Sequence, residues 1–544
     1  MNSNTPDVLI VGAGPVGMTA ASELARWGVN VRIVDKKPGP TEESRAGLVQ
    51  VRTLEVLDAI GIVDHWKAVG YPLNYTGFRA FGKRLGTIDL SGVNSPHPAP
   101  LMIGQDVTEQ LLCQQLQSVG IPVEYTVEAL GFTQDKDGVN VTLRHADGQE
   151  ELAHAHWIIG CEGSHSLVRE TLNISWSGQR YEDQEVLILD ATLRWSYPLG
   201  RGYVFIEKDL LLICFPWNDA GSYRFICVRW TDADSNHSQP SLAEMQQLLQ
   251  QIVCNVADPD ASLENPTWSS RFHLQYSLAG HMRQGRALIA GDAVHVHAPV
   301  AGQGMNTGMQ DAFNLAWKLA SVIKGVVRPE LLDSYNLERH IVAQSLISGT
   351  DRSFRVLTHP NTLVEWVMKL LGPIALNWET IQNRFRTTVA ETDIGYPDSP
   401  LTEERVGSHG LAAGDRVPDA TVVRLSDRQT IRLFEVLRGT RWTLLLLGGW
   451  EAVAETYASL QDIGKTISSK YREHVETFLV AAGLPIPSNS SVPVLMDLEH
   501  SLHKQFEADS TCLYLVRPDW YVGFRGKPEN IDNLMAYLAR VFIV

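Results

Sequence analysis

Three acidic residues of this chain, Asp35, Glu162 and Asp292, each follow an apolar run and each have their own glycine turn. A carboxylate at the end of a strand can accept hydrogen bonds from the hydroxyl groups of a sugar. A glycine turn in front of a helix brings backbone N–H groups close to a phosphate. These residue types in this order indicate that the chain binds a nucleotide.

The first acid closes a complete dinucleotide-binding pattern, which runs from a strand through a glycine turn and a helix to a second strand. In order, its residues are 8–11, Gly12, Gly14, Pro15, Gly17, 31–34 and Asp35. Gly12 allows the tight turn, Gly14 lets a pyrophosphate approach the backbone, and Gly17 lets helix and strand pack closely. Pro15 suits the first turn of a helix, where its missing N–H has no partner to lose. Asp35 is placed to bind a ribose.

The other two acids stand in the same local order. Apolar residues 157–160 lead to Glu162, and apolar residues 287–290 lead to Gly291 and Asp292. Glu162 can serve a cofactor or cap the helix that follows it, and its neighbours alone favour the cap. Asp292 is itself negative, so we expect a sugar hydroxyl and not a phosphate as its partner.

A glycine-rich turn separates Asp292 from a long helix predicted over residues 309–322, and such a turn presents N–H groups and the positive helix end to an anion. The turn contains Pro299, Ala301, Gly302, Gln303, Gly304, Met305 and Asn306. His295 and His297 precede it with i, i+2 spacing and no third ligand nearby, so we expect no metal site.

Arg45 lies shortly after the dinucleotide pattern, in a loop. Its guanidinium could pair with a phosphate or meet the carbonyl edge of a bound ring, and it could equally be a solvated loop residue. The sequence leaves these interpretations open.

Composition excludes several classes of protein. The chain has 544 residues, 44% of them hydrophobic and 20% charged, as in a globular protein with two or three domains. Its net charge of −16 argues against a nucleic-acid partner, and no apolar run is long enough to span a membrane. The six cysteines are scattered without a C-x-x-C pair and the chain opens directly on a strand, so we expect a cytoplasmic protein with reduced thiols.

The middle of the chain changes to alternating strands between residues 186 and 230, which predicts an antiparallel sheet inserted into an α/β chain. Its aromatic residues could line a pocket for a large flat molecule or form the core of the sheet itself; they include Phe205, Phe215, Trp217, Tyr223 and Phe225. A segment rich in proline and glycine around residue 400 predicts a linker to a separate α/β unit.

Over roughly residues 6 to 350, the three motifs in order resemble the FAD-dependent aromatic hydroxylases, the family of para-hydroxybenzoate hydroxylase and phenol hydroxylase. The end unit resembles the thioredoxin-like domain of phenol hydroxylase and of polyketide-tailoring members. The resemblance implies an α/β fold with a Rossmann-like FAD-binding domain (1–180 and 270–395, with a helical extension). It further implies a substrate-binding sheet (181–269, with parts of 71–105), a linker (396–414) and a thioredoxin-like domain without redox cysteines (415–544).

The same resemblance assigns cofactor contacts. Gly12, Gly14 and Gly17 match the glycines that hold the FAD pyrophosphate, and Asp35 matches the residue that holds the adenosine ribose. The positions expected nearer the flavin or its ribityl chain are Arg45, Gln105, Gly291, Asp292, Pro299, Gly302, Gln303, Gly304, Met305 and Asn306. Glu162 matches a motif tied to both FAD and the nicotinamide cofactor. Asp35, Glu162 and Ala301 depart from the commoner Glu, Asp and Gly of the family.

By this analogy the enzyme is a monooxygenase in which NADPH or NADH reduces FAD, O₂ forms a flavin hydroperoxide, and one oxygen atom enters an aromatic or phenolic ring, which the aromatic sheet suggests is polycyclic. Baeyer–Villiger insertion or epoxidation of a polyketide-like substrate is the alternative. A nicotinamide-dependent dehydrogenase and a flavin-binding protein without turnover are more distant ones. We assign no catalytic base, although Arg229, His273 and Tyr203 are candidates. A homodimer stays open.

Overall fold

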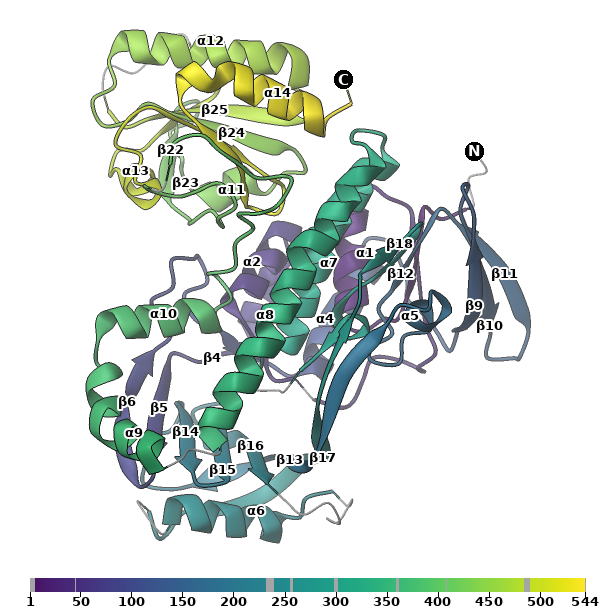
Figure 1. Ribbon diagram of the computed structural model, residues 1–544, viewed down its shortest axis with the longest axis vertical. Helices are drawn as coiled ribbons and strands as arrows, with labels where there is room; N and C mark the ends of the chain where they lie inside the picture. The colour runs from purple at the N-terminus through teal and green to yellow at the C-terminus, as the bar shows by residue number, and fades with distance from the viewer. Residues whose placement is uncertain are drawn as a thin grey trace.

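Three parts lie one after another along the molecule in the computed structural model (Figure 1): an antiparallel sheet at one end, a parallel sheet with helices in the middle, and an α/β unit at the other end. The structure describes residues 5–44, 46–230, 239–254, 258–297, 302–358, 362–407, 409–483 and 490–543. Within these ranges, every helix is too short or too polar to cross a membrane.

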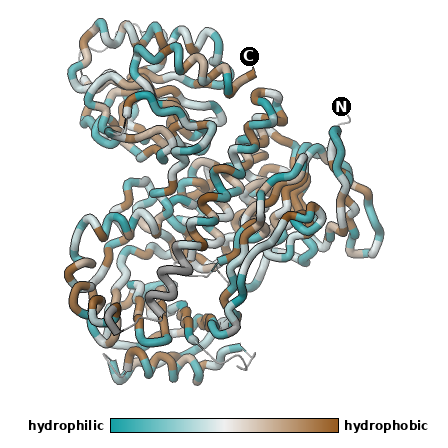
Figure 2. The backbone as a smooth tube through the Cα atoms, in the orientation of Figure 1, coloured by the Kyte–Doolittle hydropathy of each residue, from teal (hydrophilic) through white to brown (hydrophobic). Residues whose placement is uncertain are grey.

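The middle part is built on a six-stranded sheet whose central strands are parallel. In spatial order the strands are β18 (Arg283–Gln284), β19 (Ala287–Ile289), β12 (Trp157–Gly160), β1 (Val8–Val11), β2 (Val31–Asp35) and β8 (Glu124–Tyr125). β1, β12 and β19 are buried along their whole length, as strands covered by helices on both faces must be. Figure 2 shows hydrophobic residues, in brown, in the middle part as well as in the other two parts of the molecule.

Helices α1 (Pro15–Arg26) and α7 (Gly304–Ile323) pack against each other beside this sheet. Other helices before residue 400 are α2 (Val51–Ile60), α3 (Val63–Val69), α4 (Gln105–Ser118), α5 (Leu167–Thr171), α8 (Asp333–Thr358), α9 (Thr362–Ala375) and α10 (Glu379–Val389). Two small sheets flank the domain, one of β9 (Glu128–Gln134), β10 (Val139–Arg144) and β11 (Glu150–Ala155), the other of β3 (Leu48–Val49), β7 (Leu101–Met102) and β4 (Tyr71–Pro72).

The inserted sheet has eight strands, of which β13 and β17 run from the middle part to the far end of the molecule (Figure 1). In order they are β20 (His295–Val296), β17 (Ser262–Ala279), β13 (Trp176–Arg194), β16 (Ser222–Trp230), β15 (Leu210–Pro216), β14 (Gly202–Glu207), β5 (Tyr75–Ala80) and β6 (Lys83–Asp89). One face packs against α6 (Leu242–Leu249), which runs into a π-helix over Gln250–Cys254. The opposite face contacts α8 and α9.

The two faces divide the aromatic residues that we expected in one place, because successive side chains of a strand point to opposite faces. Phe205, Tyr223 and Phe225 belong to the core beneath α6, so the interpretation as sheet core is correct for them. Phe215 and Trp217 lie on the opposite face.

The end unit is a second eight-stranded sheet, with α12 and α14 covering one side (Figure 1). In order its strands are β21 (Glu403–Glu404), β28 (Val522–Gly526), β27 (Cys512–Val516), β24 (Trp442–Leu447), β25 (Val475–Ala481), β26 (Val494–Met496), β22 (Thr421–Arg424) and β23 (Thr430–Arg432). Its helices include α11 (Leu433–Leu437), α12 (Ala454–Tyr471), α13 (Ser501–Phe506) and α14 (Ile531–Val541). β21 lies inside segment 396–414, which we expected to be a linker. It pairs with β28, so this part of the segment belongs to the sheet of the end unit.

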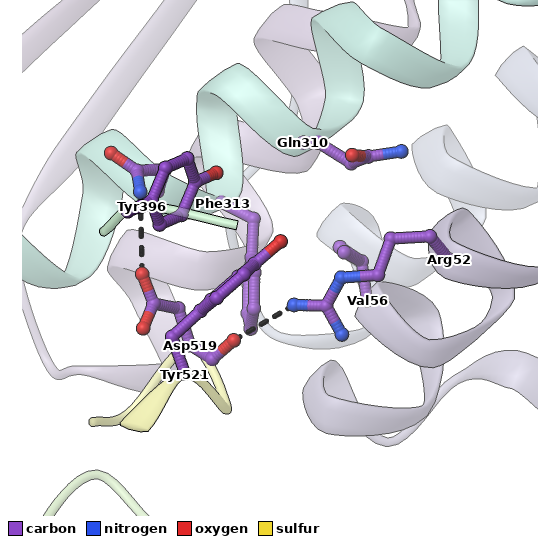
Figure 3. Close-up of a pocket in the computed structure, with 8 residues that line it drawn as sticks. Arg52, Val56, Gln310, Phe313, Tyr396, Asp519 and Tyr521 are labelled. Carbon is purple, nitrogen blue, oxygen red and sulfur yellow. Dashed lines mark hydrogen bonds between the residues drawn. The ribbon is translucent and has the colours of Figure 1, made fainter. Parts of the chain in front are cut away.

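Buried ion pairs join the end unit to the middle part. Arg517 binds Glu338 of α8 (Nη1–Oε1, 2.7 Å) and Asp519 (Nη2–Oδ2, 2.6 Å), and all three side chains are at most 1% exposed. Lys318 of α7 also binds Glu338, at 2.7 Å. In Figure 3, Asp519 lies between the two parts and its carbonyl accepts a hydrogen bond from Arg52 of α2. The end unit is therefore docked through charge and is not merely tethered.

Candidate active site

The three acids predicted from the sequence follow three strands of the same sheet. Asp35 ends β2, Glu162 follows β12 and Asp292 follows β19, and the order β19-β12-β1-β2 places all three at the carboxyl edge. Ligands of open parallel sheets bind at this edge, where the loops leave the strands. The structure thus brings the three motifs together, as the sequence pattern predicts.

The three glycines of the first turn are required for different physical reasons. Gly12 has a φ of 100°, and a Cβ there would lie 2.4 Å from the carbonyl oxygen of Cys161. A Cβ at Gly17 would lie 1.9 Å from the Gly12 oxygen, so both positions exclude side chains by packing alone. A Cβ at Gly14 would meet no atom within 4 Å, because it would point into open space before Pro15 begins α1. That space is where a pyrophosphate fits against the helix N-terminus.

Asp35 fastens the glycine turn to the end of β2. Its side chain accepts hydrogen bonds from the backbone N–H groups of Ala13 (2.7 Å) and Lys37 (2.8 Å). An ionised carboxylate has about four acceptor positions, so two are left for a ribose. The residue has a structural role in addition to the one that the sequence predicts.

Glu162 is bound within its own loop. Its carboxylate accepts hydrogen bonds from Ser166 Oγ (2.7 Å) and from the Val168 backbone N–H (3.1 Å), at the start of α5. Burial raises the pKa of this carboxyl above its usual range, although these donors lower it. The geometry favours the helix-capping interpretation, and a contact to a cofactor stays a prediction.

The third motif interlocks with the first. Gly291 has a φ of 65°, and a Cβ there would lie 2.7 Å from Val16 Cγ2 of α1. Gly308 of α7 approaches the same Val16 methyl group, at 2.7 Å from its own hypothetical Cβ. The side chain of Asp292 is exposed, on a short 3₁₀ turn over Gly291–Ala293. The contact of this exposed carboxylate to a sugar hydroxyl stays a prediction.

Helix α7 begins inside the predicted glycine-rich turn, at Gly304 and not at residue 309, so Gly304, Met305 and Asn306 belong to the first turn of the helix. Its first intrahelical hydrogen bond runs from Thr307 N to Gln303 O (2.8 Å), so the N–H groups of residues 304–306 precede the helical ladder. Gly302 has a φ of 65°, and Met305 packs against the core. Gln303 donates to the carbonyl of Thr388 (3.3 Å). The start of α7 thus has N–H groups that come before the helical ladder, and their contact to an anion stays a prediction.

The side-chain amide of Asn306 is held by three hydrogen bonds within the protein, which use both of its N–H donors. It accepts from Gln50 N (2.8 Å) and donates to the carbonyls of Leu48 (2.8 Å) and Gly302 (2.7 Å), and it is fully buried. Asn306 holds the turn against the segment that follows the loop of residue 45. Any contact of Asn306 to the cofactor is thus expected from its backbone.

Gln105 is the first residue of α4 and lies next to the predicted Arg45 loop. Its Oε1 accepts from Ala46 N (3.4 Å), and its amide donates to Glu109 (2.9 Å). Arg45 and Pro299 lie outside the described residues, so their cofactor contacts stay predictions. Gln105 therefore lies beside the loop of residue 45, and its contact to the flavin or the ribityl chain stays a prediction.

A buried polar cluster behind the third motif escaped the sequence reading. Asp311 of α7 accepts hydrogen bonds from Gly291 N (3.2 Å), from His295 Nε2 (2.8 Å) and from Arg339 Nε (2.6 Å). Burial pushes the pKa of Asp311 upward, but Arg339 and His295 outweigh it and hold the pKa below its usual range. The cluster fixes the shape of the turn that carries Asp292. Polar residues on the inner face of helix α7 were the available signal.

Two of the three candidate bases are on the wrong side of the inserted sheet. Arg229 is paired with Glu185 and Glu244 on the α6 side (both 2.7 Å), and Tyr203 donates to the carbonyl of Pro198 (2.9 Å) within the same core. Strand alternation turned both away from the cofactor side. His273 is opposite Glu185 in the ladder of β13 and β17. The role of a catalytic base is not assigned to any of them.

The face opposite α6 presents aromatic and cationic groups to the segment around Gly47. A Cβ at Gly47 would lie 2.9 Å from Arg224 Nη1 and 3.1 Å from Trp217 Cη2. Phe215, on β15, lies on the same face of the sheet. An aromatic surface of the inserted sheet thus meets the loop that follows residue 45.

Two family models match the chain: "FAD binding domain" over residues 5–350 and "Aromatic-ring hydroxylase, C-terminal" over residues 410–543. The chain belongs to the FAD-dependent aromatic-ring hydroxylases. The predicted family, fold class, cofactor and enzyme class are confirmed, and insertion of oxygen by Baeyer–Villiger or epoxidation chemistry is not favoured.

Named relatives cover almost the whole chain. 6-Methylpretetramide 4-monooxygenase of Streptomyces rimosus is 33% identical over 99% of this chain and 94% of its own. Pentachlorophenol 4-monooxygenase of Sphingobium chlorophenolicum is 32% identical over 97% and 95%. Among solved structures, anhydrotetracycline hydroxylase of Streptomyces rimosus superimposes with a TM-score of 0.75, at 27% identity over 99% of both chains. This FAD-dependent monooxygenase therefore acts on an aromatic substrate.

Proposed function

We propose that this monooxygenase hydroxylates a phenolic ring of a fused polycyclic molecule, with O₂ as the oxygen donor and NADPH or NADH as the reductant. The observation that carries the proposal is the aromatic face of the inserted sheet, where Trp217 approaches Gly47 and both Phe215 and Trp217 pack against the cluster that contains Leu48. Flat aromatic walls bind flat apolar molecules by stacking. The printed names of the relatives, which refer to 6-methylpretetramide, pentachlorophenol and anhydrotetracycline, support a phenolic or polycyclic substrate.

The proposed FAD seat runs along the carboxyl edge of the parallel sheet. The open space at Gly14 and the N-terminus of α1 take the pyrophosphate, and Asp35 takes the adenosine ribose. Asp292 and the N–H groups at the start of α7 face the flavin end. When bound, FAD supplies the electron transfer and the activation of oxygen.

The chain's own residues then have three tasks. The N–H groups at the positive end of α7 stabilise negative charge near the flavin. The aromatic face of the inserted sheet orients the substrate ring and keeps water away from it. The Asp311 cluster holds the Asp292 turn in place, since its carboxylate binds the Gly291 N–H.

We further propose that the enzyme works in the cytoplasm, where the nicotinamide reductant is available, and as a homodimer. Support for the dimer is an apolar stripe over α9 and the start of α10, where Trp366, Leu370, Ile374 and Trp378 are 52–62% exposed. Contiguous exposed apolar surface commonly marks an interface. Sedimentation of the purified protein tests this assembly.

The function is tested by the rate of NADPH and NADH oxidation in the presence of phenols. We expect pentachlorophenol, anhydrotetracycline or 1-naphthol to accelerate the oxidation of NADPH or NADH by the purified enzyme at least about tenfold. The reason is that binding positions the substrate ring for the reaction. The O-methyl ethers of the simple phenols serve as matched controls and should accelerate it far less. Bound FAD with no acceleration by any phenol would contradict the proposed function.

A further inference from the structure

A buried arginine on the aromatic face of the inserted sheet has a donor without a partner. Arg224, on β16, is 1% exposed and binds Asp190 of β13 in a two-point ion pair (Nε–Oδ1, 2.8 Å; Nη2–Oδ2, 2.7 Å). Its guanidinium lies over Trp217 at 4.8 Å and over Trp268 at 5.0 Å from the ring centres. No acceptor within the described ranges is in hydrogen-bond distance of Nη1.

The unpartnered Nη1 points toward the cofactor side of the sheet. A Cβ at Gly47 would lie 2.9 Å from this nitrogen, so Nη1 reaches the loop that follows residue 45. A buried donor without an acceptor is destabilising, and more so when the group is charged. The ion pair with Asp190 fixes the direction of Nη1. This nitrogen is therefore oriented to donate to an acceptor on a bound ligand.

We propose that Arg224 Nη1 binds the ionised phenol oxygen of the aromatic substrate. This inference rests on the proposed function and adds the group that recognises the substrate. The rings of Trp217 and Trp268 lie 4.8 and 5.0 Å from the guanidinium, so the ring of the substrate can join these aromatic contacts while its oxygen meets the guanidinium edge. A charge-assisted hydrogen bond of this kind favours the phenolate over the neutral phenol.

The ion pair with Asp190 holds the guanidinium in one orientation and compensates its charge before the substrate binds. Asp190 occupies Nε and Nη2 and fixes the plane of the group, so binding does not have to order a flexible side chain. Asp190 also compensates the buried charge in the absence of substrate. Within the described residues only Nη1, the nitrogen nearest Gly47, is left without a hydrogen-bond partner.

The test uses the FAD-loaded enzyme and two variants, Arg224→Met and Arg224→Lys. The probe is pentachlorophenol, which is ionised at neutral pH, and its matched control is the ether pentachloroanisole. Arg224→Met should bind pentachlorophenol about 10- to 100-fold more weakly with unchanged FAD content, because one charge-assisted hydrogen bond is lost. Arg224→Lys keeps the charge without the planar fork and should bind about 3- to 10-fold more weakly. Binding of the ether should change less than about threefold in both variants, because it has no ionised oxygen.

Arg229→Met is the matched protein control. Arg229 is on the same strand and is also paired with glutamates, but it lies on the α6 face, so pentachlorophenol binding should not change. If Arg224→Met is too unstable to purify, Arg224→Lys decides the question, and anhydrotetracycline is the second probe.

Three results would overturn the inference. Equal affinity of wild type and the Arg224 variants for both phenols would show that no substrate oxygen meets Nη1. Loss of FAD from Arg224→Met would show that the partner is the cofactor. An equal loss in Arg229→Met would show a general effect on the sheet. Failure of the proposed function is seen separately, as wild-type enzyme whose NAD(P)H oxidation no phenol accelerates.

Discussion

Two buried arginines of this enzyme differ in how many of their side-chain nitrogens have a hydrogen-bond partner. Arg517, at the junction of the end unit, has partners for all three side-chain nitrogens among Glu338 and Asp519. Arg224, on the inserted sheet, has partners for two of its three. Both lie against tryptophan rings. The fully paired Arg517 holds two parts of the protein together, whereas the unpaired Nη1 of Arg224 beside Gly47 is the donor that we propose for the substrate.

The comparison also separates stability from chemistry along the chain. The Arg517 junction includes Lys318 of α7 and Trp317, whose indole N–H donates to Asp519 (3.0 Å). Helix α7 therefore contacts the end unit through Asn314 and Trp317, and its start lies where we propose the flavin end of FAD. We expect the end unit to stabilise the position of α7, in line with the structural role predicted for it.

Removal of Arg517 should have the largest effect on stability. Arg517→Met leaves Glu338 and Asp519 buried with only Lys318 for compensation, so the free energy of unfolding should fall by about 3–5 kcal/mol. Denaturant unfolding followed by tryptophan fluorescence measures this loss.

The matched control is Arg540→Met, which breaks an ion pair with Glu403 of the same unit. Arg540 is 56% exposed, and its loss should change the free energy of unfolding by less than about 1 kcal/mol. Similar losses in the two variants would mean that the Arg517 shell does not hold the junction, and the contrast with Arg224 would lose its basis.

A smaller, pH-dependent effect is expected from Glu391, which lies between α7 and the start of the end unit. Burial raises the pKa of this carboxyl to about 8, although hydrogen bonds from Gln310 and Thr307 and the charge of Arg339 act against the shift. The unfolded chain releases this proton near pH 4.5, whereas the folded protein keeps it up to about pH 8. Stability should therefore fall as pH rises between these values, by about 1.4 kcal/mol per pH unit at most.

Glu391→Gln removes the titration and keeps the shape of the side chain. The difference in melting temperature between this variant and wild type should grow in favour of the variant from pH 5 to pH 8 and level off above it. A constant difference over that range would show that Glu391 is ionised in the folded protein. Arg339 would then be its effective partner.

Much of the fold and of the cofactor edge could be predicted from the sequence. The apolar run 8–11 with its glycines, and the acids at residues 35, 162 and 292, specify local geometry directly, because a strand end followed by a glycine turn has few alternatives. The structure places all three at one sheet edge. Strand alternation likewise decides which aromatic residues share a face, although the sequence alone did not say which face is covered by α6.

The rest depends on contacts between distant segments. Asp311 and Arg339 are ordinary helical residues until folding brings them behind Gly291. Arg224 and Asp190 meet across neighbouring strands, and the junction of Glu338 with Arg517 spans 179 residues. The segment 396–414 was expected to be a linker, yet β21 pairs with β28 within the end unit. Such pairings leave no local pattern that a single sequence reveals.

The seat of FAD is tested most directly by the flavin content of Gly14→Ala beside Gly17→Ala. Gly14 has an ordinary φ of −77° and open space, so Gly14→Ala should fold with wild-type stability and lose most of its FAD, because the methyl group occupies the position of the pyrophosphate. Gly17→Ala should instead destabilise the protein, because its Cβ would lie 1.9 Å from the Gly12 oxygen. A stable Gly14→Ala variant with wild-type flavin absorbance would contradict the account.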